Sequence, residues 1–186
     1  ATTAAIAHLR DRWPEMPIVG LEPAVKPACM TTQKRRIAVL ATEHSLRSEM
    51  FLSTAQRYAE DVEVIKVVGE GFVDIVERGM EATEEAREAV RRVVEPLLAK
   101  DIDKIVLGCT HYPFIKKELS EFLGDRDIAL IDGSEGTARQ IKRRLTEEGL
   151  LRDCSHEGKV TILNSSEDPK MIDISRKLFD MEIDEL

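Results

Sequence analysis

The stretch Lys104-Ile105-Val106-Leu107-Gly108-Cys109-Thr110-His111-Tyr112-Pro113 decides how the fold of this chain is interpreted. A short apolar run rich in β-branched residues ends at Gly108, and an amphipathic segment, 114–123, follows Pro113. That order predicts a buried strand, a tight turn and a helix. It places Cys109 at the carboxyl end of a strand, where open α/β sheets bind their ligands.

Cys109 has the surroundings that a reactive cysteine needs. A thiol becomes a competent base when its pKa falls toward neutrality, and both a helix N-terminus and a nearby imidazole lower it. The alternative is a structural cysteine, because free cysteine packs like a small apolar residue. The glycine before Cys109, and the threonine and His111 after it, favour a catalytic site over that alternative.

Strand-like and helix-like runs alternate on both sides of this stretch. The expected strands cover 16–20, 36–41, 62–68, 103–107, 128–131 and 159–163. The expected helices cover 1–13, 46–59, 83–100, 114–123, 135–148 and 169–179. Pro23 and Pro27 are expected to interrupt regular structure and to form a connector. Such alternation predicts an α/β fold of parallel strands with helices on both faces of the sheet.

Length and composition limit the classes of partner. The chain has 186 residues, enough for one large α/β domain or two small ones. Its 27 basic and 35 acidic side chains leave a net charge of −8, which argues against nucleic acid as a partner. No apolar run approaches the roughly 20 residues that span a bilayer. Three cysteines indicate no disulfide framework. We therefore expect a cytoplasmic protein with no membrane partner.

Two Cys-x-His pairs, at 109/111 and 154/156, raise the alternative of a zinc site. Structural zinc sites usually use wider ligand spacings, and four ligands cannot be assembled convincingly from these pairs. We therefore expect no metal, with His156 as an exposed loop histidine.

Gly108-Cys109-Thr110-His111-Tyr112-Pro113, preceded by Ile-Val-Leu, resembles the second active-site motif of glutamate racemases. These are cofactor-independent enzymes of the aspartate/glutamate racemase superfamily. Segments that resemble the family in the same order are 20–24, 37–42 with Ser45 and Ser48, 72–77 with Gly79, and 130–134. The resemblance covers nearly the whole chain. It implies an isomerase that interconverts L- and D-glutamate for peptidoglycan synthesis without a cofactor.

The resemblance also implies two similar α/β lobes, with mostly parallel sheets flanked by helices and the active site between the lobes. The second lobe is expected at 32–132, and 1–31 with 133–186 are expected to form an incomplete first lobe. Family members carry another catalytic cysteine in a Cys-Asn-Thr motif, and Ala1-Thr2-Thr3 resembles the residues that follow it. We therefore expect the amino-terminal part of the racemase, with that cysteine, to lie upstream of Ala1. Cys29 and Cys154 are poor substitutes, so the activity of this chain alone stays open.

The family's catalytic roles can be carried over residue by residue. Cys109 is then one of two acid/base thiols, His111 assists its ionisation and contacts substrate, and Thr110 binds the charged groups of the substrate. The resemblance implies that Glu77 supports the thiol and the imidazole. The alternative for Glu77 is a solvated carboxylate at a helix end.

Thr42 and Ser45 are weaker candidates for substrate binding. They follow a neighbouring strand, whose end is expected to lie beside that of the strand before Cys109. Helix capping explains the two hydroxyls equally well, because Ser and Thr are preferred at helix starts.

Other functions stay open beside glutamate racemisation. One is racemisation of aspartate or a related amino acid, and another is substrate binding by a catalytically incomplete fragment. A third is hydrolysis with Cys109 as the nucleophile. The expected partner is a small-molecule substrate, glutamate, and the oligomeric state is undecided, with a homodimer as one alternative.

Overall fold

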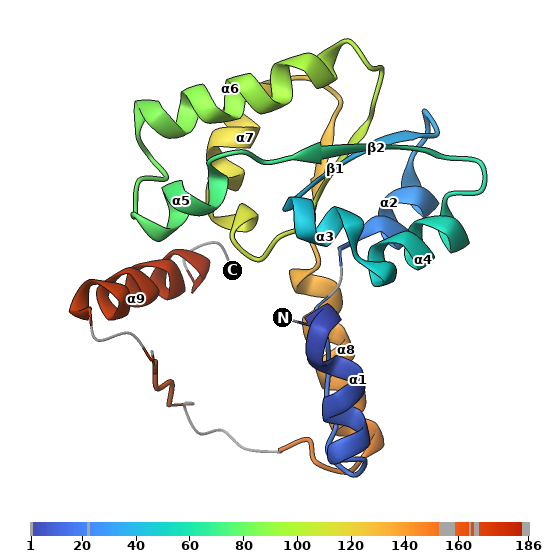
Figure 1. The fold of residues 1–186 in the computed structure, drawn as a ribbon, viewed down its shortest axis with the longest axis vertical. Helices are drawn as coiled ribbons and strands as arrows, with labels where there is room; N and C mark the ends of the chain where they lie inside the picture. Colours follow the sequence, from blue (N-terminus) through green and yellow to red (C-terminus); the bar gives the residue numbers. More distant parts are fainter. Residues whose placement is uncertain (1, 22, 153–158, 164, 166–167, 184–186) are drawn as a thin grey trace.

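The centre of the chain is a four-stranded parallel sheet in the order β2-β1-β3-β4 (Figure 1). It is seen in a computed structural model that describes residues 2–21, 23–152, 159–163, 165 and 168–183. The strands are β1 (Arg36–Ala41), β2 (Glu63–Val68), β3 (Lys104–Leu107) and β4 (Ala129–Ile131). The sheet confirms the α/β class that the alternating sequence pattern predicts.

Helices cover both faces of the sheet, because alternate residues of a strand point to opposite sides. Ala38 and Leu40 of β1 belong to one core cluster, and Ile37 and Val39 belong to the other. The first cluster is covered by α5 (Phe72–Glu77), α6 (Glu84–Leu98), η1 (Tyr112–Ile115) and α7 (Lys116–Leu123). The second is covered by α2 (Val25–Thr31), α3 (Glu43–Arg47) and α4 (Glu49–Tyr58). Burial on both faces explains why β1 and β3 are almost entirely apolar.

Three further helices are α1 (Thr2–Arg12), α8 (Ser134–Glu147) and α9 (Pro169–Ile183), of which α9 packs Leu178 against the first cluster. Figure 1 shows α1 and α8 side by side, away from the sheet, whereas α9 lies near α5. No residue of α8 is buried, so its apolar side chains are not packed in a core. Among the described residues, no helix is long and apolar enough to cross a bilayer.

Two expected strands are absent. Residues 16–20 and 159–163 have irregular backbone instead. A strand must pair its N–H and C=O groups with a neighbour, and the described part of the chain places no strand beside either segment. The β-branched residues that suggested strands there therefore do not form them.

The predicted connector at Pro23 and Pro27 and the predicted helix at 46–59 were wrong in detail. The expected connector at Pro23 and Pro27 contains α2, and Pro27 occupies its first turn, where a missing N–H leaves no hydrogen bond unmade. The helix expected over 46–59 begins earlier, at Glu43, and is divided at Ser48, whose backbone is extended. The Ser48 hydroxyl accepts a hydrogen bond from Phe51 N (3.3 Å) and so starts α4 as a new helix.

Candidate active site

Cys109 sits where the sequence places it, just beyond the carboxyl end of β3. Gly108 links the two, and its N–H donates to Leu40 O of the neighbouring strand over 2.7 Å. A Cβ at Gly108 would lie 3.1 Å from both Ala41 Cβ and Leu40 O, which is tighter than ordinary contact. Glycine is therefore required by the close approach of the two strand ends, which fixes where Cys109 begins.

His111 joins Cys109 to Glu77. Nδ1 of His111 lies 3.8 Å from Cys109 Sγ, and its Nε2 lies 3.2 Å from Glu77 Oε1. The Cys109 side chain is half-buried, whereas 31% of the His111 side chain and 52% of the Glu77 side chain are exposed. A nucleophile or base oriented by an imidazole, which is itself oriented by a carboxylate, is a recurring catalytic arrangement. The structure thus brings together the three residues expected to be catalytic.

The pKa of Cys109 moves in the direction opposite to the one expected. Burial raises it above the ordinary value of a thiol, and hydrogen bonds from His111 N and from Thr110 lower it only in part. The expected helix start is also weaker than predicted, since a single 3-10 turn, η1, stands between His111 and α7. Burial therefore favours the protonated form of the Cys109 thiol.

Tyr112 fixes the position of the residues around it. Its hydroxyl donates to Gly69 O (3.3 Å), and its ring packs edge-on against Phe72, with centroids 5.2 Å apart. Burial raises the pKa of Tyr112, so its hydroxyl stays protonated and donates. Phe72 starts α5, the helix that ends at Glu77, so this contact holds the two segments of the candidate site together.

Residues 1–141 match the family model described as Asp/Glu/Hydantoin racemase. The chain is 39% identical over 181 residues to the glutamate racemase of Clostridium acetobutylicum, an alignment that covers 97% of this chain and 70% of that protein. This chain belongs to the aspartate/glutamate racemase family. The membership confirms the resemblance carried by the Cys-Thr-His motif.

Solved racemases share the fold of this family member. Glutamate racemase isoform RacE1 from Bacillus anthracis superposes with a TM-score of 0.70 at 28% identity, covering 82% of this chain and 57% of that one. The glutamate racemase from Francisella tularensis, solved with D-glutamate, superposes with a TM-score of 0.79 at 18% identity, covering 96% and 66%. The chain therefore spans between 57% and 70% of the length of these relatives.

The other expected substrate-binding residues of this racemase-family chain lie near the same edge of the sheet. Thr42 follows β1, and Leu40 of that strand pairs with Leu107 of β3. Thr42 Oγ1 donates to Ser45 Oγ (2.9 Å) and accepts from Ser45 N (3.3 Å), so it caps α3 as the alternative supposed. Thr110 is exposed beside Cys109. A substrate contact by these hydroxyls stays a prediction.

Cys29, the other described cysteine, does not supply a second thiol next to Cys109. Cys29 packs against the core cluster on one face of the sheet, and Cys109 packs against the cluster on the opposite face. Cys154 and His156, which carried the zinc alternative, lie outside the described residues. Within those residues, no three His, Cys, Asp or Glu side chains are placed to share a metal ion.

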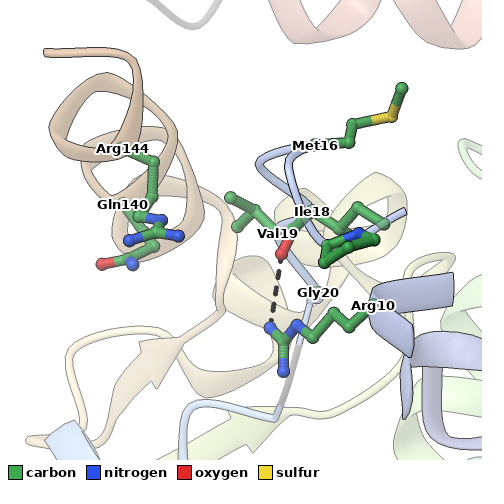
Figure 2. A pocket seen from close by; sticks show the side chains of 8 residues that line it. Arg10, Met16, Ile18, Val19, Gly20, Gln140 and Arg144 are labelled. Carbon is green, nitrogen blue, oxygen red and sulfur yellow. Dashed lines mark hydrogen bonds between the residues drawn. The ribbon is translucent and has the colours of Figure 1, made fainter. Parts of the chain in front are cut away.

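A polar hollow of about 520 Å³ lies between α8 and the segment that follows α1 (Figure 2). Gln140 and Arg144 line it from α8, and Arg10 of α1 donates to Ile18 O (3.3 Å) on the other side. None of the residues expected to be functional lines this hollow. It belongs to the part of the chain outside the sheet, not to the Cys109 site.

Sequence reasoning missed an ion pair between a buried carboxylate and a half-exposed lysine beside the site. Glu81 is 2% exposed and lies 2.7 Å from Lys177 Nζ. The two residues are 96 positions apart, so no local spacing could connect them. The one available signal is Glu81 itself, an acid in the short turn between two helices that pack on the core.

Proposed function

We propose that the protein to which this chain belongs is a glutamate racemase that inverts the α-carbon of glutamate with two thiols and no cofactor. The observation that carries the proposal is the arrangement of Cys109, His111 and Glu77 at the carboxyl edge of the sheet, in a chain of the racemase family. Each of these residues also matches the motif by which the sequence resembles glutamate racemases.

Inversion requires a base on one face of the α-carbon and an acid on the other. A thiolate on one face takes the α-proton, so the Cα–H bond breaks and an S–H bond forms. A protonated thiol on the opposite face gives its proton to the carbanion, so its S–H bond breaks and a new Cα–H bond forms. Cys109, whose pKa is raised by burial, is suited to the second of these steps.

The reverse reaction requires Cys109 to act as a base. His111 Nδ1, 3.8 Å from the sulfur, is placed to accept the proton, and Glu77 Oε1 lies 3.2 Å from the opposite ring nitrogen. Cys109, His111 and Glu77 therefore act as one acid/base unit.

Glutamate is the proposed substrate, because named relatives act on it. The glutamate racemase of Escherichia coli was solved with L-glutamate and that of Francisella tularensis with D-glutamate. The exposed Thr110 and the hydroxyls of Thr42 and Ser45 are the proposed contacts for its charged groups. A comparison of glutamate and aspartate turnover separates this substrate from the shorter one.

The proposed domain organisation follows the sheet. All four strands lie within 36–131, which supports a second lobe at 32–132. Residues 1–31 and 133–186 are proposed to belong to the first lobe, which the side-by-side placement of α1 and α8 in Figure 1 supports, whereas α2 and Leu178 of α9 pack on the sheet of the second lobe. The opposing thiol is expected in a Cys-Asn-Thr motif of the first lobe, and the whole enzyme is expected in the cytoplasm.

Exchange of the α-proton in deuterated water tests the proposed function. The protein encoded by the complete gene should incorporate deuterium at Cα of both glutamate enantiomers, and Cys109→Ala should abolish racemisation in both directions. Cys29→Ala is the matched control, because that thiol lies on the opposite face of the sheet and should be dispensable. Racemisation that survives Cys109→Ala would overturn the proposal.

A further inference from the structure

The carboxy-terminal helix α9 contacts the turn that follows Glu77. Lys177 Nζ lies 2.7 Å from Glu81 Oε2 and donates to Gly79 O over 3.1 Å. Both acceptors lie between α5 and α6, within four residues of Glu77. A single side chain of α9 thus makes two polar contacts to the segment that carries the partner of His111.

The contact with Glu81 differs from the many ion pairs on the surface of this chain. Glu81 is almost completely buried, and its second oxygen, Oε1, has no hydrogen-bond partner among the described residues. A buried carboxylate without a cation is strongly unfavourable, whereas exposed ion pairs contribute little. In the described part of the chain, Lys177 is the one cation within ion-pair distance of Glu81. The position of the Lys177 ammonium group is therefore fixed by Glu81.

Lys177 contacts the cap that ends α5. Gly79 N donates to Val76 O (3.0 Å) and Met80 N donates to Ile75 O (2.9 Å), which is the pattern of a Schellman cap. Gly79 has φ of +66°, as this cap requires, and a Cβ there would lie 3.6 Å from Lys177 Nζ. Glu77 is the last residue of α5, so whatever holds this cap also sets the position of its side chain.

The helix α9 also bears on the position of His111, the partner of Glu77. Leu178 packs against the core cluster that contains Tyr112 and Ile115, and α9 contacts η1. The η1 turn begins directly after His111. The helix α9 therefore contacts both the segment that carries Glu77, through Lys177, and the segment that follows His111.

We propose that Lys177 is a positioning residue, through which α9 holds Glu77 and His111 at the distance that the Cys109 site uses. We call the contacts of Lys177 with Glu81 and Gly79 the clamp. The proposal rests on the proposed function only for the effect of the clamp on catalysis, since the clamp itself is a property of this chain. It also gives the carboxy-terminal helix, which the proposed domain organisation assigns to the first lobe, a direct connection to the acid/base unit of the second.

The test replaces the buried ion pair by an uncharged pair of similar shape. Lys177→Met with Glu81→Gln removes the clamp without leaving a buried charge, so the variant is expected to fold. The matched control is Arg176→Met, since Arg176 is the neighbouring residue of α9 and pairs with Asp173 on the exposed surface. The readout is the rate at which iodoacetamide alkylates Cys109, followed between pH 7 and pH 10 by peptide mass spectrometry.

We expect the double variant to alkylate Cys109 about tenfold more slowly at pH 8, because His111 is no longer held to accept the thiol proton. Lys177→Arg, which keeps the charge, and Arg176→Met should each stay within about twofold of the native rate. An unchanged alkylation rate in the double variant would overturn the clamp, even where its melting temperature falls. In the complete enzyme, the double variant should lower kcat more than it changes KM for glutamate.

The two proposals fail in different ways. Slow alkylation in the double variant of a protein that does not racemise glutamate would retain the clamp and reject the proposed function. Normal alkylation together with active racemisation would reject the clamp and retain the function. Slow alkylation with an unchanged kcat in an active racemase would show that the clamp does not act in catalysis, and would overturn Lys177 as a positioning residue.

Discussion

His111 Nε2 lies 3.2 Å from Oε1 of Glu77, although the two residues are 34 positions apart and come from different segments. Glu77 is the last residue of α5, and His111 is the residue before η1. Tyr112, the residue after His111, packs on Phe72 at the other end of α5 and so joins the same two segments. A carboxylate in this position selects the ring nitrogen that carries the proton and orients the imidazole toward Cys109.

Glu77→Gln should lower kcat for racemisation by about 10²-fold, because the amide can hold His111 but cannot stabilise its positive form. KM for glutamate should change little, since the contact of Glu77 is with the imidazole of His111 and not with the sulfur of Cys109. The measurement is initial rates by circular dichroism from each enantiomer. Glu85→Gln is the matched control, because Glu85 pairs with Arg78 on the surface nearby. Full activity of Glu77→Gln would exclude Glu77 from the acid/base unit.

The raised pKa of Cys109 should be visible in the pH dependence of its alkylation rate. Burial is its main cause, so alkylation of Cys109 in the native protein should have its midpoint above the usual thiol value of 9.0. The folded state then holds the thiol proton more tightly than the unfolded state does. The stability that this provides is complete below pH 9.0 and is lost as pH rises through the folded pKa. A midpoint below that of the urea-unfolded chain would contradict this assignment.

Gly108→Ala should destabilise the chain by about 1 to 3 kcal/mol, because the new methyl group meets Ala41 Cβ and the backbone of Leu40 at 3.1 Å. Backbone atoms in the centre of a sheet cannot easily move away. Gly136→Ala is the matched control: it lies in α8 with nothing within 4 Å, and alanine there should stabilise by up to about 1 kcal/mol. Urea unfolding measures both changes, and equal effects would show that the strand ends do not approach as described.

Asp103 should make the stability of the chain depend on pH in the acidic range. Burial alone would raise its pKa, but hydrogen bonds from Thr32 Oγ1 (2.6 Å), Gln33 N (2.6 Å) and Lys34 N (3.3 Å) leave it below the ordinary 3.8. A lowered pKa gives stability that is present above pH 3.8 and is lost as pH falls through the folded value. Asp103 thereby ties residues 32–34 to the start of β3.

Asp103→Asn should therefore lower the unfolding free energy at pH 7 by about 1 to 3 kcal/mol, because its amide group would face the N–H of Gln33. The variant should also lose the component of acid destabilisation that the native chain shows below pH 4. Asp101→Asn is the control, since Asp101 forms an exposed pair with Lys34 and should change neither property noticeably. Parallel acid transitions in the native chain and in Asp103→Asn would reject this role.

The sequence predicted the sheet and the three residues of the candidate site, but not what surrounds them. Apolar runs such as 36–41 and 103–107 can be recognised because burial on both faces leaves few polar positions. The run 16–20 has similar residues but no neighbouring strand, and strand formation depends on that neighbour. Pro27 suggested a connector, because sequence alone does not show whether a proline lies in the first turn of a helix. Contacts such as Lys177 with Glu81 depend on the tertiary arrangement alone.

The exposed apolar side chains of α8 and its surroundings predict how the isolated chain 1–186 behaves. Trp13, Met16, Ile141, Leu150 and Leu151 are all exposed, and α8 buries no residue. Apolar surface of this extent favours association, so the chain alone should bind the dye ANS and should form oligomers as its concentration rises. Light scattering and ANS fluorescence measure this behaviour.

Ile141→Lys with Leu151→Lys should reduce both signals, because the charges interrupt the apolar surface beside α8. The control is Leu163→Lys, which changes a still more exposed apolar residue in a different segment and should leave association nearly unchanged. A native chain that stays monomeric and melts in one sharp transition would contradict the prediction. It would mean that α1 and α8 form a stable unit with the sheet in spite of the apolar surface that they leave exposed.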